Sequence, residues 1–213
     1  MELVTERLVL REFEEEDWPG LLAYQADPRY LQYYAWTERT PEAVQEFVRT
    51  FLAQQRERPR AKFQLAVTLK SNAQLIGTCG IRLASAGAHE GDIGYELTPE
   101  QWGHGYATEA ARAMVRFGFT ELGLHRIWSW CIADNVGSAR VLEKLGMQLE
   151  GRLRDKEYFK ERWWDRLIFA ILDHEWREQQ TSLTPGSRTG RAPPHSLAAC
   201  RRPSGSLPPP PRR

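Results

Sequence analysis

The stretch QWGHGYATEA, residues 101–110, places two glycines around a histidine and follows them at once with helix-forming residues. The first turn of a helix leaves backbone N–H groups without partners, and the helix dipole favours negative charge at that end. Because Gly103 and Gly105 lack Cβ atoms, a bulky anion can approach those amides closely. The spacing therefore predicts a phosphate-binding loop, in which His104 is a loop residue able to touch the phosphate.

Two common kinds of phosphate loop do not fit this stretch. A P-loop carries Gly-Lys followed by Ser or Thr, which is absent here. A dinucleotide fingerprint needs a third glycine three residues after Gly105, where this chain has Thr108, and a parallel strand–helix–strand core around it. A metal site at His104 is not expected either, because no second ligand stands at a useful spacing.

The loop lies between a strand and a helix in the predicted order of elements. Alternation over 92–97 predicts the strand before it, and the apolar spacing of 108–123 predicts the helix after it. Strands are also predicted over 5–13, 62–70, 74–83, 125–132, 149–159 and 162–172, and helices over 14–27, 40–58 and 135–146. Thr40 is expected to cap one helix and Gly146 to end another. The order indicates a mixed α/β domain that begins with antiparallel strands.

Composition divides the chain into a domain over residues 1–178 and a Pro/Arg/Ser-rich tail over 179–213. Six arginines, eight of the 13 prolines and no acidic residue follow residue 180. A segment with so few large apolar side chains buries too little surface to offset its ordering entropy, so we expect a disordered tail. The whole chain balances 29 basic against 28 acidic residues. The domain is therefore mildly acidic, which argues against direct nucleic-acid binding.

The cysteines and the apolar runs indicate a cytoplasmic protein. Cys79, Cys131 and Cys200 are odd in number and far apart, with neither a pairing pattern nor a metal-ligand spacing. The first ten residues carry charges inside their apolar run, unlike a signal peptide. No apolar run approaches 18 residues, so no membrane span is expected.

Four segments in a fixed order carry a family resemblance. YELTPEQWGHGYATEA (95–110) is followed by NVGSARVLEKLGM (135–147), with TERLVLREF (5–13) before them and LEGRLRDKEYFKERWWDRLIFAIL (149–172) after them. Together they resemble the GNAT superfamily of N-acetyltransferases, specifically its RimJ/RimL-type branch. The resemblance covers nearly all of residues 3–176.

This resemblance implies a mixed, mostly antiparallel central sheet, flanked by helices, that splays open between its fourth and fifth strands, here 92–97 and 126–132. Acetyl-CoA is expected in that cleft, without a metal. Trp102 replaces the usual Gln or Arg of the loop, which costs a side-chain contact and keeps the amide cradle. The resemblance assigns cofactor contacts to Leu97, Gly103, His104, Gly105, Tyr106, Ala107, Thr108, Asn135 and Ser138. Asn135 is alternatively a helix N-cap, and both roles are compatible.

Transfer from a thioester to an amine needs a neutral amine, an oxyanion donor and a proton for the leaving thiolate. Glu96 is the best candidate for the base, acting through one water, although a strand carboxylate facing solvent explains it equally well. The backbone N–H near Leu97 is the oxyanion donor by family analogy. Many superfamily members carry a tyrosine that acts as the general acid at the position where this chain has Leu142. Ser138 is the substitute candidate, Tyr158 is the next, and the thiolate alternatively takes its proton from water.

Acidic and aromatic side chains describe the acceptor side less specifically. Glu109 is expected to pair with Arg112, three residues on. Four acids either attract a cationic amine or form salt bridges: Glu12, Asp155, Glu157 and Asp165. By family position, the segment 33–36 borders the acceptor pocket. Adjacent aromatics such as Trp163 and Trp164 cannot both face one way in a strand, so some are expected to be exposed.

The resemblance implies an enzyme that transfers the acetyl group of acetyl-CoA to a primary amine. The acceptor is either a protein N-terminal α-amine or a small-molecule amine. The alternative is a non-catalytic sensor that binds acyl-CoA, a hypothesis left open by the missing tyrosine. No membrane or nucleic-acid partner is expected. The resemblance also allows a homodimer, because members of the branch often self-associate.

Overall fold

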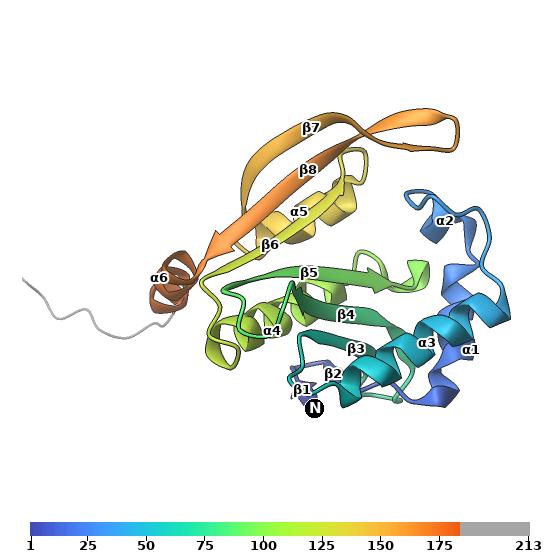
Figure 1. The fold of residues 1–213 in the computed structure, drawn as a ribbon, viewed down its shortest axis with the longest axis horizontal. Helices are drawn as coiled ribbons and strands as arrows, with labels where there is room; N and C mark the ends of the chain where they lie inside the picture. Colours follow the sequence, from blue (N-terminus) through green and yellow to red (C-terminus); the bar gives the residue numbers. More distant parts are fainter. Residues whose placement is uncertain (184–213) are drawn as a thin grey trace, which may run out of the picture. The chain divides into compact units, whose positions relative to one another are not determined.

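Eight strands form a single sheet in the computed structural model, which describes residues 1–183 (Figure 1). They are β1 (Glu2–Val4), β2 (Leu8–Arg11), β3 (Lys62–Leu69), β4 (Leu75–Leu83), β5 (Glu90–Leu97), β6 (Arg126–Ile132), β7 (Gln148–Phe159) and β8 (Arg162–Leu172). Their spatial order is β1-β2-β3-β4-β5-β6-β8-β7, and all neighbours are antiparallel except β5 and β6, which are parallel. The predicted mixed, mostly antiparallel sheet is confirmed.

The helices are α1 (Trp18–Gln25), α2 (Pro28–Leu31), α3 (Pro41–Arg56), α4 (Tyr106–Thr120), α5 (Val136–Lys144) and α6 (Asp173–Leu183), with 3-10 turns η1 (Glu15–Asp17) and η2 (Pro99–Gln101). Thr40 caps α3 as predicted, because its Oγ1 accepts from the Ala43 N–H at 3.3 Å. Gly146 follows α5 with φ +81°, the left-handed conformation predicted for it. Helix α2 is missing from the prediction because four residues are too short to show a period.

Helices cover both faces of the sheet (Figure 1). Helices α4 and α5 pack on one face, where Met114 and Leu142 join a core with Leu65 and other strand residues. Helices α1 and α3 pack on the opposite face through a second cluster that contains Ala66. Successive residues of β3 thus enter different cores, which is the period of two that the alternation of a strand requires. The sheet is held rigidly between these layers.

Helix α6 ends at Leu183, past the domain boundary predicted at residue 178. The remainder of the predicted tail, 184–213, lies outside the described residues. Within residues 1–183, no helix is long and apolar enough to cross a membrane.

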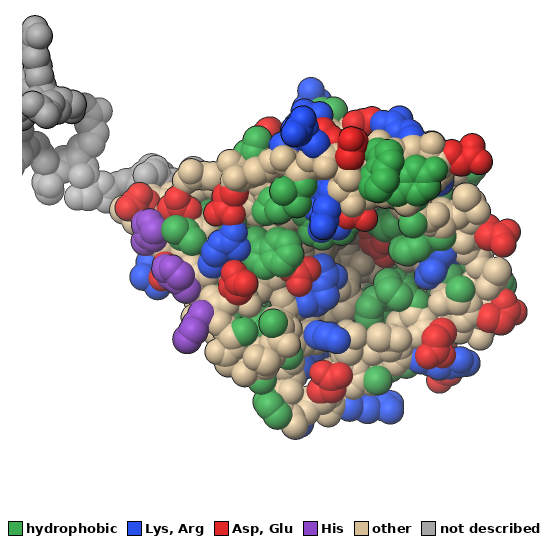
Figure 2. Space-filling view, turned by 45° about the horizontal axis from the view of Figure 1, so that its top comes forward, with side chains coloured by type: hydrophobic (Ala, Val, Ile, Leu, Met, Phe, Trp, Pro, Cys, Tyr) green, Lys and Arg blue, Asp and Glu red, His purple; other side chains and the backbone are tan. Residues whose placement is uncertain are grey.

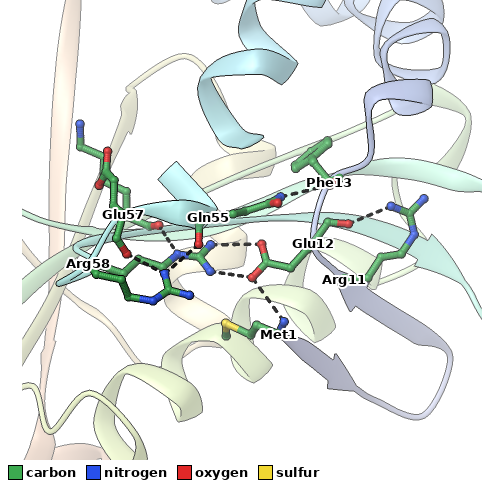
Figure 3. Close-up of polar contacts among 9 residues, drawn as sticks. Met1, Arg11, Glu12, Phe13, Gln55, Glu57 and Arg58 are labelled. Atoms are coloured by element: carbon green, nitrogen blue, oxygen red, sulfur yellow. Dashed lines mark hydrogen bonds and ion pairs between the residues drawn. The ribbon is translucent and has the colours of Figure 1, made fainter. Parts of the chain in front are cut away.

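A polar cluster joins the end of β2 to the end of α3 (Figure 3). The carboxylate of Glu12 accepts from Arg60 Nη1 at 2.6 Å and from Nη2 at 3.1 Å. Gln55 Nε2 donates to the Phe13 carbonyl oxygen at 3.2 Å. Glu12, which the sequence left open as an amine attractor, therefore forms a salt bridge.

Candidate active site

Strands β5 and β6 pair only at their beginnings and then diverge. Their parallel register ends at Asp92 and Trp128. The next contact is a side-chain one, in which the Ser129 hydroxyl donates to the Ile93 carbonyl oxygen at 2.8 Å. The sheet is thus splayed between the two strands that the resemblance names fourth and fifth, which are β5 and β6 when the short β1 is counted.

The glycine loop begins α4 beside this splay. Gly103 has φ +79° and Gly105 has φ +83°, a region that residues with a Cβ rarely adopt. Gly105 is the N-cap residue and has no side chain to satisfy the first amides of α4. The first intrahelical bond runs from the Glu109 N–H to the Gly105 carbonyl oxygen, at 3.0 Å. The amides of residues 106–108 are therefore left for another acceptor, which fits a phosphate.

Trp102 fastens the loop to the end of β5. Its indole Nε1 donates to the Leu97 carbonyl oxygen at 2.8 Å, so this tryptophan holds the loop against its own strand. The Thr98 N–H donates to the Ile76 carbonyl oxygen at 2.8 Å. Because successive amides of a strand point to opposite sides, the Leu97 N–H is directed away from β4 and toward the splay. An oxyanion donor in the cleft requires that direction.

His104 lies on the exposed side of the loop. Its Nδ1 is 3.0 Å from the Trp102 carbonyl oxygen, and its ring stacks on Tyr106 with centroids 5.9 Å apart. Across residues 1–183, no group of three or more His, Cys, Asp or Glu side chains is arranged to hold a metal. His104 is thus a loop residue beside the amides.

Asn135 and Ser138 lie at the start of α5, where Ser138 contacts β5 beside the splay. Asn135 Oδ1 accepts from the Ser138 N–H at 3.0 Å, so Asn135 is the helix N-cap, and its NH₂ group remains able to donate. The hydroxyl of Tyr95, on β5, lies 3.0 Å from Ser138 Oγ and 3.0 Å from the Ser138 carbonyl oxygen. One side chain of β5 therefore bridges to the helix that follows β6.

Tyr95 is a hydroxyl near the cleft that sequence reasoning missed. The position of the usual superfamily tyrosine is Leu142, which is 0% exposed in the core. Tyr158, the other candidate acid, is 60% exposed and packs against Trp163. The alternation of β5 is the available signal, since it places Tyr95 on the face of α4 and α5 and Glu96 on the other.

Glu96 is surrounded by hydroxyl groups and does not simply face solvent. Its Oε1 accepts from the Tyr24 hydroxyl at 3.0 Å and from Gln25 Nε2 at 2.9 Å, with the Thr78 hydroxyl at 3.4 Å. Its Oε2 accepts from the hydroxyls of Tyr30 and Tyr34, the latter at 3.2 Å. We name Tyr24, Tyr30 and Tyr34 the tyrosine shell of Glu96.

Burial raises the pKa of all three phenols of the tyrosine shell, and the adjacent Glu96 charge raises it further. The three hydroxyls therefore stay protonated and donate to the carboxylate. Tyr24 and Tyr30 are buried, whereas Tyr34 is half-buried and stacks on Trp36 with centroids 4.7 Å apart. Figure 2 shows a hollow on this part of the surface, bordered by hydrophobic side chains and with an acidic group inside.

The turn of the β7–β8 hairpin meets the α2 segment across the hollow. Lys160 Nζ donates to the Leu31 carbonyl oxygen at 2.6 Å, and the Tyr33 hydroxyl donates to the Asp134 carbonyl oxygen at 3.0 Å. Tyr33 also packs edge-on against Trp164, which is buried while Trp163 is exposed, as the alternation predicts. Tyr33 therefore contacts both the β7–β8 hairpin and the residue that follows β6 by two positions.

The ion pairs of Glu109, Glu157 and Asp165 test what the sequence predicted for these acidic residues. Glu109 does not pair with Arg112, which instead donates to the Lys144 carbonyl oxygen at 3.2 Å. Glu109 pairs with Arg7, because the entry to β2 lies against the first turn of α4 and offers both a side chain and an amide. Glu157 and Asp165 form ion pairs with arginines 166 and 152.

A loop of uncapped amides beside a splayed sheet, with a carboxylate and hydroxyls at the gap, defines a protein of the acyl-CoA transferase class. The sequence profile of the acetyltransferase (GNAT) domain matches residues 7–148. The chain belongs to this family of acetyl-CoA-dependent N-acetyltransferases.

The chain aligns with nearly the whole length of two relatives that are more than 30% identical to it. The uncharacterized N-acetyltransferase YnaD of Bacillus subtilis (strain 168) is 35% identical over 178 residues, which are 83% of this chain and 99% of YnaD. The crystal structure of a GNAT-family acetyltransferase from Bacillus anthracis is 32% identical, with a TM-score of 0.72 over 82% of this chain and 99% of that one.

Two more distant structures share the fold and were solved with coenzyme A. RimL, a ribosomal L7/L12 alpha-N-protein acetyltransferase, is 20% identical with a TM-score of 0.71, over 81% of this chain and 98% of RimL. A spermidine N-acetyltransferase from Vibrio cholerae, in complex with CoA and spermine, is 19% identical with a TM-score of 0.70, over 81% of this chain and 99% of that one. At these identities the likeness is one of fold.

Proposed function

We propose that this enzyme acetylates primary amines from acetyl-CoA and that it favours an α-amine, as at a protein N-terminus, over more basic amines. The observation that carries the preference is Glu96 with its tyrosine shell, at the hollow beside the splay. Five side chains donate to this carboxylate, namely Tyr24, Gln25, Tyr30, Tyr34 and Thr78, so no direct contact with an amine is needed to satisfy it.

In this proposal the glycine loop and α5 hold the cofactor. Gly103 and Gly105 allow the pyrophosphate to reach the amides of residues 106–108, with His104 beside them, and Asn135 and Ser138 contact the pantetheine arm. Bound acetyl-CoA supplies the thioester that is attacked. The Leu97 N–H donates to the thioester oxygen as negative charge develops on it.

Glu96 receives the proton of the attacking amine through a hydroxyl of its shell. Tyr34 is the relay candidate because it is the half-buried member and its hydroxyl is 3.2 Å from Glu96 Oε2. The amine gives its proton to Tyr34 as Tyr34 gives its own to Glu96, so the phenol stays neutral throughout. A hydroxyl thereby takes the place of the water expected between base and amine.

Ser138 and Tyr95 deliver the proton to the leaving sulfur. As the carbon–sulfur bond breaks and the carbon–nitrogen bond forms, the thiolate takes a proton from Ser138 Oγ. Ser138 Oγ takes one in turn from Tyr95, whose hydroxyl turns to it from the Ser138 carbonyl oxygen, both oxygens being 3.0 Å away. Water then returns a proton to Tyr95, and Glu96 releases the proton taken from the amine to the solvent, which restores the water. The products are the acetylated amine and the free thiol of coenzyme A.

The acceptor preference follows from proton affinity. About a tenth of an α-amine is neutral at pH 7, whereas less than about a thousandth of a lysine-like amine is. A base that works only through a hydroxyl suits the less basic amine. Three carboxylates that could attract a polycation are already paired, since Asp92 contacts Arg82, Glu157 contacts Arg166 and Asp134 contacts Arg162.

An acceptor screen tests this proposal. Thiol release from acetyl-CoA is followed with peptides that differ only in a free or blocked N-terminus, with lysine side-chain amines, and with spermidine and spermine. The largest kcat/KM is expected for free N-termini. A polyamine preference would overturn the acceptor class, and calorimetric binding of acetyl-CoA without turnover on any acceptor would favour the non-catalytic sensor.

A further inference from the structure

We propose that Arg7 is a positioning residue for the cofactor, which holds the glycine loop and the first turn of α4 in the shape that binds the phosphates of coenzyme A. This inference rests on the proposed role of that loop. Arg7 precedes β2 and lies about a hundred residues before the loop in sequence, and no motif of the family resemblance assigns it a role.

The Arg7 guanidinium contacts both parts of the loop structure. Its Nε donates to Glu109 Oε2 at 2.7 Å, and its Nη1 donates to the His104 carbonyl oxygen at 3.0 Å. The Arg7 backbone N–H donates to Glu109 Oε1 at 2.8 Å, and the Thr5 hydroxyl donates to the same oxygen at 2.7 Å. The loop carbonyl and the helix carboxylate are therefore fixed to one planar group.

The same guanidinium also lies over the first residue of α4. Its central carbon is 4.4 Å from the centroid of the Tyr106 ring, a cation–π distance. A Cβ built on Gly105 would lie 3.6 Å from Arg7 Nη2, so Arg7 lines the glycine as well. Three consecutive residues, His104 to Tyr106, thus share one side chain as their support.

Electrostatics gives this contact a second consequence. Glu109 stands in the first turn of α4, where an unpaired carboxylate would repel a phosphate bound at the helix start. Burial alone would raise the pKa of Glu109, but hydrogen bonds from Thr5 and Arg7 outweigh burial and the pKa is lowered. Glu109 is therefore ionised, and Arg7 neutralises it beside the phosphate site.

Only a guanidinium supplies this set of contacts. A lysine ammonium matches the charge, but it is a point donor that cannot bond the His104 carbonyl and the Glu109 carboxylate in one plane while lying flat on Tyr106. Replacing Arg7 by lysine therefore removes the planar set of donors while it keeps the positive charge. Arg7 is 43% exposed on its side chain, so neither replacement opens a core cavity.

Calorimetric titration of coenzyme A into the purified protein tests the proposal. Arg7→Gln is expected to raise the Kd about tenfold, and Arg7→Lys to recover less than half of that loss on the free-energy scale, because positioning by a charged hydrogen-bond network is removed in both. The matched control is Arg49→Gln, an exposed arginine of α3 whose contact is Glu46, and its Kd should equal that of the wild type.

Three results would overturn the role of Arg7. They are an unchanged Kd in Arg7→Gln, full recovery in Arg7→Lys, which would reduce Arg7 to a charge, and an equal rise in the KM values of acetyl-CoA and acceptor. The expected result is a raised KM for acetyl-CoA with kcat at saturation and acceptor KM within about twofold of wild type. If the wild type itself binds no coenzyme A, the proposed function fails instead.

Glu109→Gln supplies a second variant that keeps the test decisive if Arg7→Gln folds poorly. It removes the anchor of Arg7 with an isosteric side chain and should raise the Kd by less than Arg7→Gln does, because loss of the carboxylate charge beside the phosphate offsets part of the lost positioning. The double variant is expected to bind more tightly than the product of the two single losses predicts, since both remove one interaction. If the losses of binding free energy in the two single variants simply add in the double variant, Arg7 and Glu109 do not act through one shared interaction.

Discussion

The hydroxyl of Tyr95 lies 3.0 Å from the Oγ of Ser138, which joins β5 to α5 where β5 and β6 have separated. Two hydroxyls in contact can pass a proton, whereas a serine alone is too weak an acid to protonate a thiolate efficiently. Burial raises the pKa of the Tyr95 phenol, so Tyr95 is protonated before each turnover. In the proposed mechanism, Tyr95 and Ser138 together take the place of the tyrosine that other superfamily members carry at the position of Leu142.

Tyr95→Phe should lower kcat about a hundredfold if Tyr95 feeds protons to Ser138, because this is the usual scale of general acid catalysis. The KM for acetyl-CoA should change little. Ser138→Ala should cost as much, and the double variant should cost no more than the worse single one. Steady-state kinetics of the three variants checks this, and a normal kcat in Tyr95→Phe with a deficit in Tyr158→Phe would move the role to Tyr158.

Glu96→Gln should slow the enzyme more with a lysine-like acceptor than with an α-amine. The reason is that the more basic amine depends on proton removal, while about a tenth of the α-amine is neutral at pH 7. Comparing kcat/KM for two peptides that differ only in the position of their free amine measures this difference. Equal losses would mean that Glu96 organises its tyrosine shell and does not act as the base.

Gly105→Val should weaken coenzyme A binding without unfolding the domain. A branched side chain at φ +83° costs about 1–2 kcal/mol in backbone strain and covers the amides at the start of α4. Gly87→Val is the matched control: its φ is +84° and nothing lies within 4 Å of its added Cβ. Both variants should lose similar melting temperature, and calorimetry should find weaker binding only in Gly105→Val.

Local patterns were sufficient to predict most elements and the position of the glycine loop between β5 and α4. Thr40 and Gly146 occupy the cap positions predicted for them, because capping depends on neighbours in sequence. The same reasoning underestimated Trp102, whose indole bond to the Leu97 carbonyl requires the loop to fold back on its own strand. Helix α2 was too short to leave a pattern.

The contacts that organise the site depend on tertiary structure and could not be predicted from spacing. Glu96 meets Tyr24, Tyr30 and Tyr34 only because α1 and α2 pack over one face of the sheet, more than sixty residues away in sequence. Arg112 was the expected partner of Glu109 on helical spacing, whereas the partner is Arg7, 102 residues away in sequence. Propensity identifies elements, and packing chooses the partners of charged groups.

The two described cysteines give a prediction about pH. Burial raises the pKa of Cys131 to about 11 and that of Cys79 to about 12. An ordinary thiol is a few per cent thiolate at pH 7, and the thiolate is the reactive form. In a Cys200→Ser variant, labelling of the folded protein by a thiol reagent should therefore be slow at pH 7 and should keep rising about tenfold per pH unit to pH 10.

The raised pKa of Cys131 also predicts how the stability of the folded protein changes with pH. The folded state holds the Cys131 proton up to about pH 11, whereas the unfolded chain releases it near pH 8.5. Stabilisation from this thiol is thus complete below pH 8.5 and is lost as pH rises toward 11, because the unfolded state then binds fewer protons than the folded state. Chemical denaturation of the Cys200→Ser protein and of a Cys131→Ser, Cys200→Ser protein between pH 8 and pH 10 isolates this contribution. A labelling rate that levels off near pH 8.5, or equal pH slopes in the two proteins, would show that Cys131 titrates as an ordinary exposed thiol.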